Sequence, residues 1–397
     1  MPKQIELMTN RDIFFQHLAQ TSNIPLALDI DHASGSYIFD TKGKKYLDFI
    51  SGIGVSNIGH CHPKVVKAIE FQSSKYLHTL VYGEFIQEPQ TQLALKLCKL
   101  LPPSLDNVYF LNSGAEAVEA AIKLSKRITG RTEIVSFNNA YHGSTSGALS
   151  ISGNELYKNS FRPLIPSVRI LEFNNIKDLK NISTSTAAVF IEPVQGEAGV
   201  RIADPGFLQA LNEKCKLTST LLVFDEIQCG MGRTGKLFAF EHYGIVPDIL
   251  LAGKALGGGL PLSAMICNKS LMDHFKTEPV LGHITTFGGN PLCCAAALAN
   301  LDVILGEKLM DKVPEKEALI RGLLQHPKIH ELRGKGLLLA MQLDNFDQLR
   351  KLILKCLDRG LILDWFLFDP TSVRIEPPLT ISKEEIEFAC EVILEEI

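Results

Sequence analysis

Two short apolar runs that lead into charged residues constrain this chain more than any other feature. The first covers residues 221–228 and contains Asp225, and the second covers residues 248–256 and contains Lys254, just before three glycines. Runs of this length and composition are typical of strands buried in a parallel sheet. Open α/β sheets bind ligands at the carboxyl ends of their strands. The sequence therefore predicts that a carboxylate and an amine lie at one ligand site.

The composition argues against several classes of protein. With 397 residues, 46% of them hydrophobic and 21% charged, the chain is long enough for two or three ordinary globular domains. A formal net charge of -4 favours neither nucleic acid nor a membrane surface as a partner. The 9 cysteines include no Cys-x-x-Cys pair, so we expect no disulfide framework and no metal site. No signal peptide or membrane-spanning run is apparent, which predicts a cytoplasmic protein.

The middle of the chain alternates between strand and helix patterns, which predicts an α/β fold with a mostly parallel sheet flanked by helices. The seven predicted strands are residues 108–111, 133–137, 168–171, 187–191, 221–224, 249–252 and 263–267. The N-terminal segment and the tail are predicted to form a small α+β domain. The expected boundaries are 1–60 for the N-terminal arm and part of the small domain, 61–305 for the large domain, and 306–397 for the C-terminal small domain.

A turn formed by Ser113, Gly114 and Ala115 follows the first of these strands and opens a helix. A helix N-terminus offers free N–H groups and the positive end of the helix dipole, which suits a phosphate. Ser113 and Glu116 also fit a capping box, the commoner meaning of such a pattern. The two interpretations are compatible, because a cap leaves other N–H groups free.

Asp225 and Lys254 each have an ordinary explanation and a chemical one. The aspartate could begin a helix, and a lysine before glycines is most often a surface residue. A buried carboxylate can instead keep a ring nitrogen protonated, so that the ring accepts electrons from a substrate carbanion. An amine whose pKa falls from about 10.4 towards about 7 can form a Schiff base with an aldehyde. Gln228, three residues after the aspartate, could then reach a hydroxyl of the same ring.

Five further residues lie at or near the ends of predicted strands or within one. Tyr141 fits a core aromatic or a residue that stacks on a flat ring, and His142 fits a structural histidine by default. Glu192 and Glu197 follow an apolar strand, either as solvated acids or at the functional edge of the sheet. Arg374 would usually pair with an acid, but it could also bind a substrate carboxylate through two hydrogen bonds.

Taken together, these groups match the needs of pyridoxal 5′-phosphate. They supply a phosphate seat, a stacking ring, an acid for the ring nitrogen and an amine for the aldehyde. A nucleotide-binding α/β protein is a weaker alternative, because neither Gly-x-Gly-x-x-Gly nor a Gly-Lys-Ser/Thr loop follows the strands.

The chain resembles the class III aminotransferases, which are pyridoxal-phosphate enzymes of fold type I. The resemblance covers nearly the whole chain and rests on Lys254 with its glycines and on residues 112–117, 224–228, 232–235 and 285–291. It implies a fold-type I transferase that moves an amino group, expected to be a terminal one, to 2-oxoglutarate or pyruvate in two half-reactions. An aminomutase or decarboxylase of the same fold, or a non-catalytic binding protein on this scaffold, remains an alternative.

The resemblance also implies a role for each candidate residue. Lys254 and Asp225 are the catalytic pair, the lysine as Schiff base and proton carrier. Arg374 takes the carboxylate of the keto acid, and Glu197 masks this arginine when a substrate presents only an amine. Thr286 reaches the phosphate of a neighbouring subunit, which implies a homodimer with shared active sites. The expected cofactor-binding set is Ser113, Gly114, Ala115, Tyr141, His142, Glu192, Asp225, Gln228, Lys254 and Thr286.

The chain departs from this family pattern at Ser144. Ornithine, acetylornithine and 4-aminobutyrate members commonly have arginine directly after the glycine that matches Gly143. Thr21 and Ile53 stand where ornithine-specific members tend to have tyrosines. The amino donor is therefore not identified by the resemblance.

Overall fold

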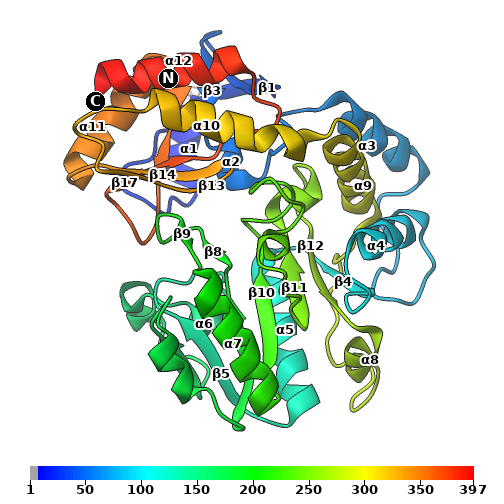
Figure 1. The fold of residues 1–397 in the computed structure, drawn as a ribbon. Helices are drawn as coiled ribbons and strands as arrows, with labels where there is room; N and C mark the ends of the chain where they lie inside the picture. The colour runs from blue at the N-terminus through cyan, green and yellow to red at the C-terminus, as the bar shows by residue number, and fades with distance from the viewer. Residues whose placement is uncertain (1–7) are drawn as a thin grey trace, which may run out of the picture.

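A seven-stranded sheet forms the centre of the larger part of the protein in Figure 1, a computed structural model that describes residues 8–397. Neighbouring strands from β11 to β6 are parallel, whereas β12 runs antiparallel to both β11 and β4. The predicted sheet is therefore confirmed, with one reversed strand. In sheet order the strands are β4 (Asn107–Leu111), β12 (Ser263–Cys267), β11 (Ile249–Ala252), β10 (Leu221–Asp225), β7 (Thr186–Ile191), β5 (Glu133–Phe137) and β6 (Val168–Leu171).

The central strands are buried on both faces, as their continuous apolar sequences require. Every residue of β7, β11 and β12 is buried, and so is every residue of β10 after Leu221. Strand β10 extends one residue beyond its predicted end, so Asp225 is its last residue. The acid is therefore fixed at the carboxyl edge of the sheet by the strand's own hydrogen bonds.

Helices cover the sheet, and a glycine in a left-handed conformation ends one of them. Helix α5 ends at Thr129 and is followed by Gly130 at a φ of 67°, a left-handed conformation that glycine adopts without strain. Cys293 and Cys294 are buried in α9, as expected for structural thiols. The helices of this part are α3 (Pro63–Lys75), α4 (Glu88–Leu100), α5 (Gly114–Thr129), α6 (Ser146–Ile151), α7 (Pro205–Thr218), α8 (Lys269–Met272) and α9 (Pro291–Gly306).

The N-terminal segment and the C-terminal tail lie together at the top of Figure 1. They are joined because β15 pairs in parallel with β3. The strands are β1 (Ile30–Ser34), β2 (Tyr37–Asp40), β3 (Lys45–Asp48) and β15 (Leu361–Ile362) in one sheet, and β13 (Glu331–Lys335), β14 (Leu338–Gln342), β17 (Ser372–Ile375) and β16 (Asp364–Trp365) in the other. A two-stranded ribbon of β8 (Val194–Gln195) and β9 (Arg201–Ile202) faces this unit from the large domain.

The small domain's helices lie along its outer side in Figure 1. They are α10 (Val313–Leu323), α11 (Phe346–Asp358) and α12 (Lys383–Glu396). The N-terminal segment adds two further helices, α1 (Asn10–His17) and α2 (Ser51–Gly54), which lie closer to the strands in this view. Ser382 and Glu385 form the predicted capping box of α12. The strand expected at residues 361–368 is instead two strands of two residues each.

Two expectations about the chain's organisation are not tested by these observations. The domain boundaries at residues 60 and 305 stay predictions, and residues 1–7 of the expected N-terminal arm lie outside the described residues. Among residues 8–397, no helix is long and apolar enough to cross a membrane.

Candidate active site

A cavity of about 330 Å³ lies at the carboxyl ends of β4, β5, β7, β10 and β11, and it brings most of the predicted site residues together. Its size is within the range of small-molecule sites. Of the predicted residues, Glu197, Arg374 and Thr286 are not part of its lining. The lining residues are Ser113, Gly114, Ala115, Tyr141, His142, Gly143, Ser144, Glu192, Asp225, Ile227, Gln228 and Lys254.

Lys254 stands directly after β11, at the start of a 3-10 turn that runs from Lys254 to Gly257. Its φ is 45°, a left-handed conformation that costs a non-glycine residue about 1–3 kcal/mol. The residue is partly exposed because it faces the cavity, but protein surrounds its amine. Burial lowers the pKa of this amine, and the carboxylates of Glu376 and Glu197 offset part of the effect. A lowered pKa favours the neutral amine that Schiff-base formation needs.

Asp225 forms a buried pair with His142. The two atoms His142 Nδ1 and Asp225 Oδ2 are 2.8 Å apart, and the other oxygen of Asp225 accepts from the backbone N–H of Ile227 at 3.1 Å. Burial acts to lower the pKa of His142, but the hydrogen bond to Asp225 and the charges of Asp225 and Glu192 outweigh it, so the pKa is raised. The histidine therefore orients the carboxyl group of the aspartate. The alternative that Asp225 begins a helix is wrong, because a series of turns follows β10.

The N-terminus of α5 meets the cavity at Ser113, Gly114 and Ala115. First-turn N–H groups have no partner inside a helix, so they are available to an anion. Ser113 Oγ accepts from the N–H of Glu116 at 3.3 Å, but the carboxylate of Glu116 accepts from the N–H of Asn112 at 2.8 Å. Only half of the predicted capping box is therefore present.

Two glycines let the backbone pass close to neighbouring groups at this end of the cavity. A Cβ at Gly114 would lie 2.9 Å from Ile227 Cδ1. At Gly143, whose φ is 125°, a Cβ would lie 2.7 Å from the Cβ of Ala115. Larger residues at either position would fill the space in front of the helix terminus.

Glu192 ties the loops on one side of the cavity together. One of its oxygens accepts from the N–H of Tyr141 at 2.9 Å and the other from the N–H of Gly196 at 3.1 Å. Burial raises the pKa of Glu192 to about 7. Tyr141 is partly buried, and its ring centre lies 6.1 Å from that of Phe368. The glutamate therefore fixes the backbone from which the predicted stacking ring projects.

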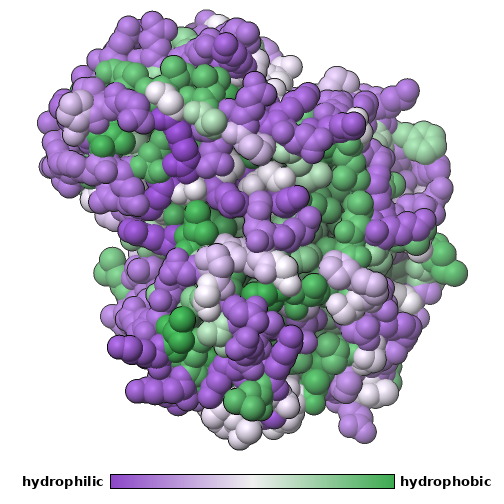
Figure 2. All heavy atoms as spheres, viewed as in Figure 1, coloured by the Kyte–Doolittle hydropathy of each residue, from purple (hydrophilic) through white to green (hydrophobic). Residues whose placement is uncertain are grey.

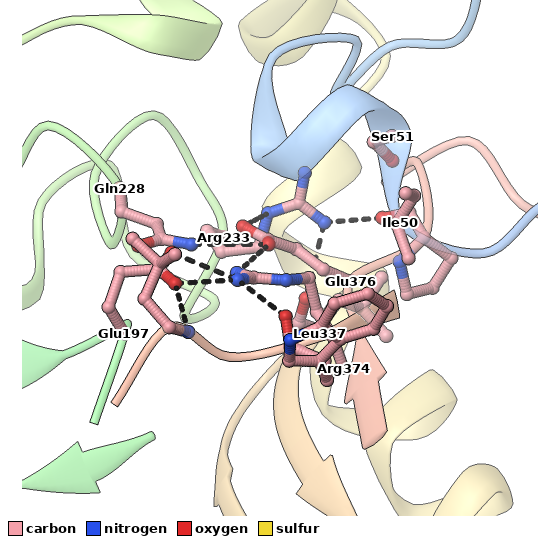
Figure 3. A network of polar contacts seen from close by, with 12 residues as sticks. Ile50, Ser51, Glu197, Gln228, Arg233, Leu337, Arg374 and Glu376 are labelled. Atoms are coloured by element: carbon pink, nitrogen blue, oxygen red, sulfur yellow. Dashed lines mark hydrogen bonds and ion pairs between the residues drawn. The ribbon is translucent and has the colours of Figure 1, made fainter. Parts of the chain in front are cut away.

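Arg374 lies beside this cavity, within a network of buried charges (Figure 3). It is 1% exposed, and its Nη2 donates to both carboxylate oxygens of Glu197 at 2.9 Å. Burial acts to raise the pKa of Glu197, but the charges of Arg374 and Lys254 and hydrogen bonds lower it overall. The expected masking pair is thus formed in the structure.

The network also contains a residue that the sequence interpretation left without a role. Glu376 accepts from Arg374 Nη1 and from Gln228 Nε2, each at 3.3 Å. Glu376 stands two positions after Arg374 at the end of β17. Side chains with this spacing face the same side of a strand, and the spacing was the signal that the sequence offered.

Thr286 lies apart from these residues. It is exposed, in the loop that precedes α9, and it does not line the cavity. This single chain therefore does not bring Thr286 to the site that it forms.

The residues of the cavity fit pyridoxal 5′-phosphate. One end carries free helix N–H groups beside two close-packed glycines, and the middle carries a buried carboxylate held by a histidine. An amine with a lowered pKa completes the set. These are the groups that a phosphate, a basic ring nitrogen and an aldehyde require.

Comparison with known proteins identifies the family. The model of the family Aminotransferase class-III matches residues 18–397. The chain belongs to the class III aminotransferases. An acetylornithine aminotransferase of Methanocaldococcus jannaschii is 43% identical, over 94% of this chain and 93% of its own length. An ornithine aminotransferase of Staphylococcus aureus is 42% identical, over 91% of this chain and 92% of its own length.

Solved structures agree with this assignment. A structure of the ornithine aminotransferase from Toxoplasma gondii, in which pyridoxal phosphate partly occupies the active site, has a TM-score of 0.90 at 32% identity. The match covers 98% of this chain and 94% of that one. This class III aminotransferase is therefore a pyridoxal-phosphate-dependent enzyme, and the predicted family, fold type, cofactor and reaction class are confirmed.

The pair of Asp225 and His142 predicts a pH-dependent stability. Because the pKa of His142 is raised on folding, the pair stabilises the protein fully below about pH 6.5 and progressively less as the pH rises through the folded pKa. We expect Asp225→Asn in cofactor-free protein to cost about 1.5–3 kcal/mol at low pH, and less at high pH. Easier ionisation of Glu192 in the variant acts in the same direction.

Urea unfolding at about pH 6 and about pH 9 measures this difference. Asp273→Asn is the control, because it removes a carboxylate from an exposed ion pair with Lys269. A cost of Asp225→Asn that is equal at both pH values, or larger at the higher one, would contradict the assigned charge of the pair.

Proposed function

We propose that this aminotransferase takes a terminal amino group from its donor and transfers it to a 2-oxo acid, 2-oxoglutarate or pyruvate. The observation that carries the proposal is that Lys254 and Asp225 line one cavity while Arg374 lies beside it, paired with Glu197. Relatives named for ornithine and acetylornithine support a donor whose reacting amine lies at the end of a chain. A cytoplasmic location belongs to the same proposal.

Some residues around the cavity bind the cofactor, and others take part in the reaction. Pyridoxal phosphate supplies an aldehyde for amines and a ring that withdraws electrons from the bond that breaks. The N–H groups of α5 bind the phosphate, and Asp225, oriented by His142, keeps a proton on the ring nitrogen. Lys254 would provide the amine for the aldehyde and would carry the proton at the reacting carbon. The remaining members of the proposed cofactor set in this cavity are Tyr141, which would stack on the ring, and Glu192 and Gln228, which shape the site. Thr286 would act from a second chain.

Arg374 and Glu197 let one site accept two kinds of substrate. A terminal amine brings no carboxylate near the reacting carbon, so the arginine stays paired with Glu197. A 2-oxo acid brings a carboxylate that competes with Glu197 for Nη2 of Arg374. Because charge-assisted pairs of this kind are strong and directional, the exchange also orients the keto group.

Replacing the proposed catalytic lysine tests the function directly. We expect Lys254→Ala to lower transamination by more than about 10³-fold, because both covalent binding and proton transfer are lost. Coupled detection of the amino acid formed from 2-oxoglutarate measures the rate. Lys269→Ala, an exposed lysine, is the control. Near-normal transfer by Lys254→Ala would refute the assignment, and product formation without any keto acid would favour a mutase.

Ser144 offers a test of donor choice. It is exposed at the cavity, where its hydroxyl lies 3.4 Å from that of Tyr141. We expect Ser144→Arg to raise kcat/KM about tenfold for donors that carry a carboxylate remote from the reacting amine, such as acetylornithine, through a charge-assisted hydrogen bond. A panel of amines and amino acids, with and without a carboxylate, measures the change. An equal change in kcat/KM for donors of both kinds would show that the residue at position 144 does not bind the carboxylate.

We also propose that two chains associate so that Thr286 of each reaches the other's cofactor site. Exposed apolar side chains surround this loop: Phe71, Leu77, Phe85, Ile86, Ile284 and Phe287. The loop of Thr286 is adjacent to the segment that contains Leu77 and Phe85, because the rings of His78 and Phe287 are 4.9 Å apart. Figure 2 shows apolar residues along the right-hand side of the molecule, in the region of α3, α4 and α9 in Figure 1. Such a patch is typical of a protein interface.

A charge placed in this patch tests the association. Ile86 is 95% exposed, so Ile86→Asp is tolerated by the isolated chain but buries a carboxylate in the proposed interface. We expect sedimentation to show a dimer for the parent protein and a monomer with weakened cofactor retention for the variant. Leu217→Asp, at a position 79% exposed on α7, is the matched control. A dimer that survives Ile86→Asp would place the interface elsewhere.

A further inference from the structure

Glu376 connects the arginine of the site with a residue of the cavity. It follows β17 and is 0% exposed. Its Oε2 accepts from Arg374 Nη1 and from Gln228 Nε2, each at 3.3 Å (Figure 3). Gln228 itself lines the cavity. One carboxylate therefore touches both the proposed substrate anchor and the proposed cofactor side of the site.

The other oxygen of Glu376 has space but no hydrogen bond. A Cβ at Gly54, whose φ is 73°, would lie 2.2 Å from Oε1, so the glycine makes room for this carboxylate. Within residues 8–397, Oε1 accepts no hydrogen bond, and the Nε atom of Arg233 is 4.0 Å away. The charge of Arg233 partly compensates this oxygen as an ion pair, but a buried carboxylate oxygen without a hydrogen bond remains costly, which argues for a role beyond packing.

Arg374 is consequently held by two carboxylates that contact different nitrogens. Glu197 occupies Nη2 and Glu376 occupies Nη1. When a substrate carboxylate displaces Glu197, the bond at Nη1 keeps the guanidinium in place. The charge of Glu376 remains beside the arginine and repels the arriving anion. Glu197 stays within the protein whether or not it is paired with Arg374. The repulsion between Glu197 and Glu376 therefore changes less during the exchange than the repulsion between Glu376 and the arriving anion.

We propose that Glu376 is a specificity-determining residue that holds Arg374 by Nη1 and weakens its attraction for substrate carboxylates. This inference rests on the proposed function, because that function assigns the keto acid's carboxylate to Arg374. A weakened anchor disfavours donors with a carboxylate beside the reacting amine and favours terminal amines. The keto acid then binds less tightly, because the attraction of Arg374 for its carboxylate is weakened. The product amino acid leaves more readily for the same reason.

Glutarate binding tests this role without any turnover, because glutarate has the two carboxylates of 2-oxoglutarate but no keto group. We expect Glu376→Gln to bind glutarate on the order of tenfold more tightly in calorimetry, since the amide keeps the hydrogen bond but removes the repelling charge. Glu376→Asp, which draws the charge back from the arginine, should have intermediate affinity. Glu133→Gln removes the acid of an arginine pair at the far end of β5 and should change nothing.

The colour of the holoenzyme gives a second measurement. Glu376 is the first of the acidic neighbours that raise the pKa of Lys254. The midpoint of the pH-dependent colour change should therefore move to lower pH in Glu376→Gln, but stay close to that of the parent protein in Glu376→Asp and Glu133→Gln. A purely structural role would weaken glutarate binding, whereas a lowered midpoint shows that the folded variant has lost only the charge.

The two measurements decide the inference separately from the function. Tighter glutarate binding with a lowered midpoint supports it, and unchanged or weaker binding in folded Glu376→Gln overturns it. Failure of the proposed function would appear instead as transamination by Lys254→Ala.

Discussion

The hydrogen bond between Asp225 and His142 is the interaction on which the site depends. A carboxylate buried in the protein interior is unfavourable unless it is paired, and the imidazole at 2.8 Å supplies the partner. The pair also fixes the orientation of the Asp225 carboxylate. Without it, β10 would still end at the cavity, but the acid at its end would lack a side-chain partner that orients it.

The sheet places the other groups with little help from side chains. Strands β4, β5, β7, β10 and β11 all deliver a residue or turn to the same edge, because chain direction and strand length fix where each one stops. The site is therefore assembled from five separate stretches of sequence. Contacts such as those of Glu192 with Tyr141 and Gly196 then adjust the loops that follow the strands.

Strand ends could be predicted from the sequence because burial on both faces requires continuous apolar runs. That is why the sheet, Asp225 and Lys254 were found, and family resemblance supplied Arg374 and Glu197. Glu376 was missed because its importance lies in contacts with Gln228 and Gly54, which are distant in sequence. The capping box was only half correct for a similar reason, since Glu116 had a competing partner in Asn112. The role of Thr286 stays a prediction, because this residue is exposed and does not line the cavity of its own chain.

The reversal of β12 has a consequence for how firmly Lys254 is held. The chain leaves the sheet at Ala252 and returns at Ser263, where it pairs with both its own preceding strand and β4. The short excursion between these residues is thus anchored on each side by interior strands. The backbone that carries the amine of Lys254 is therefore tied to the sheet at both ends, and it cannot shift far without disturbing two interior strands.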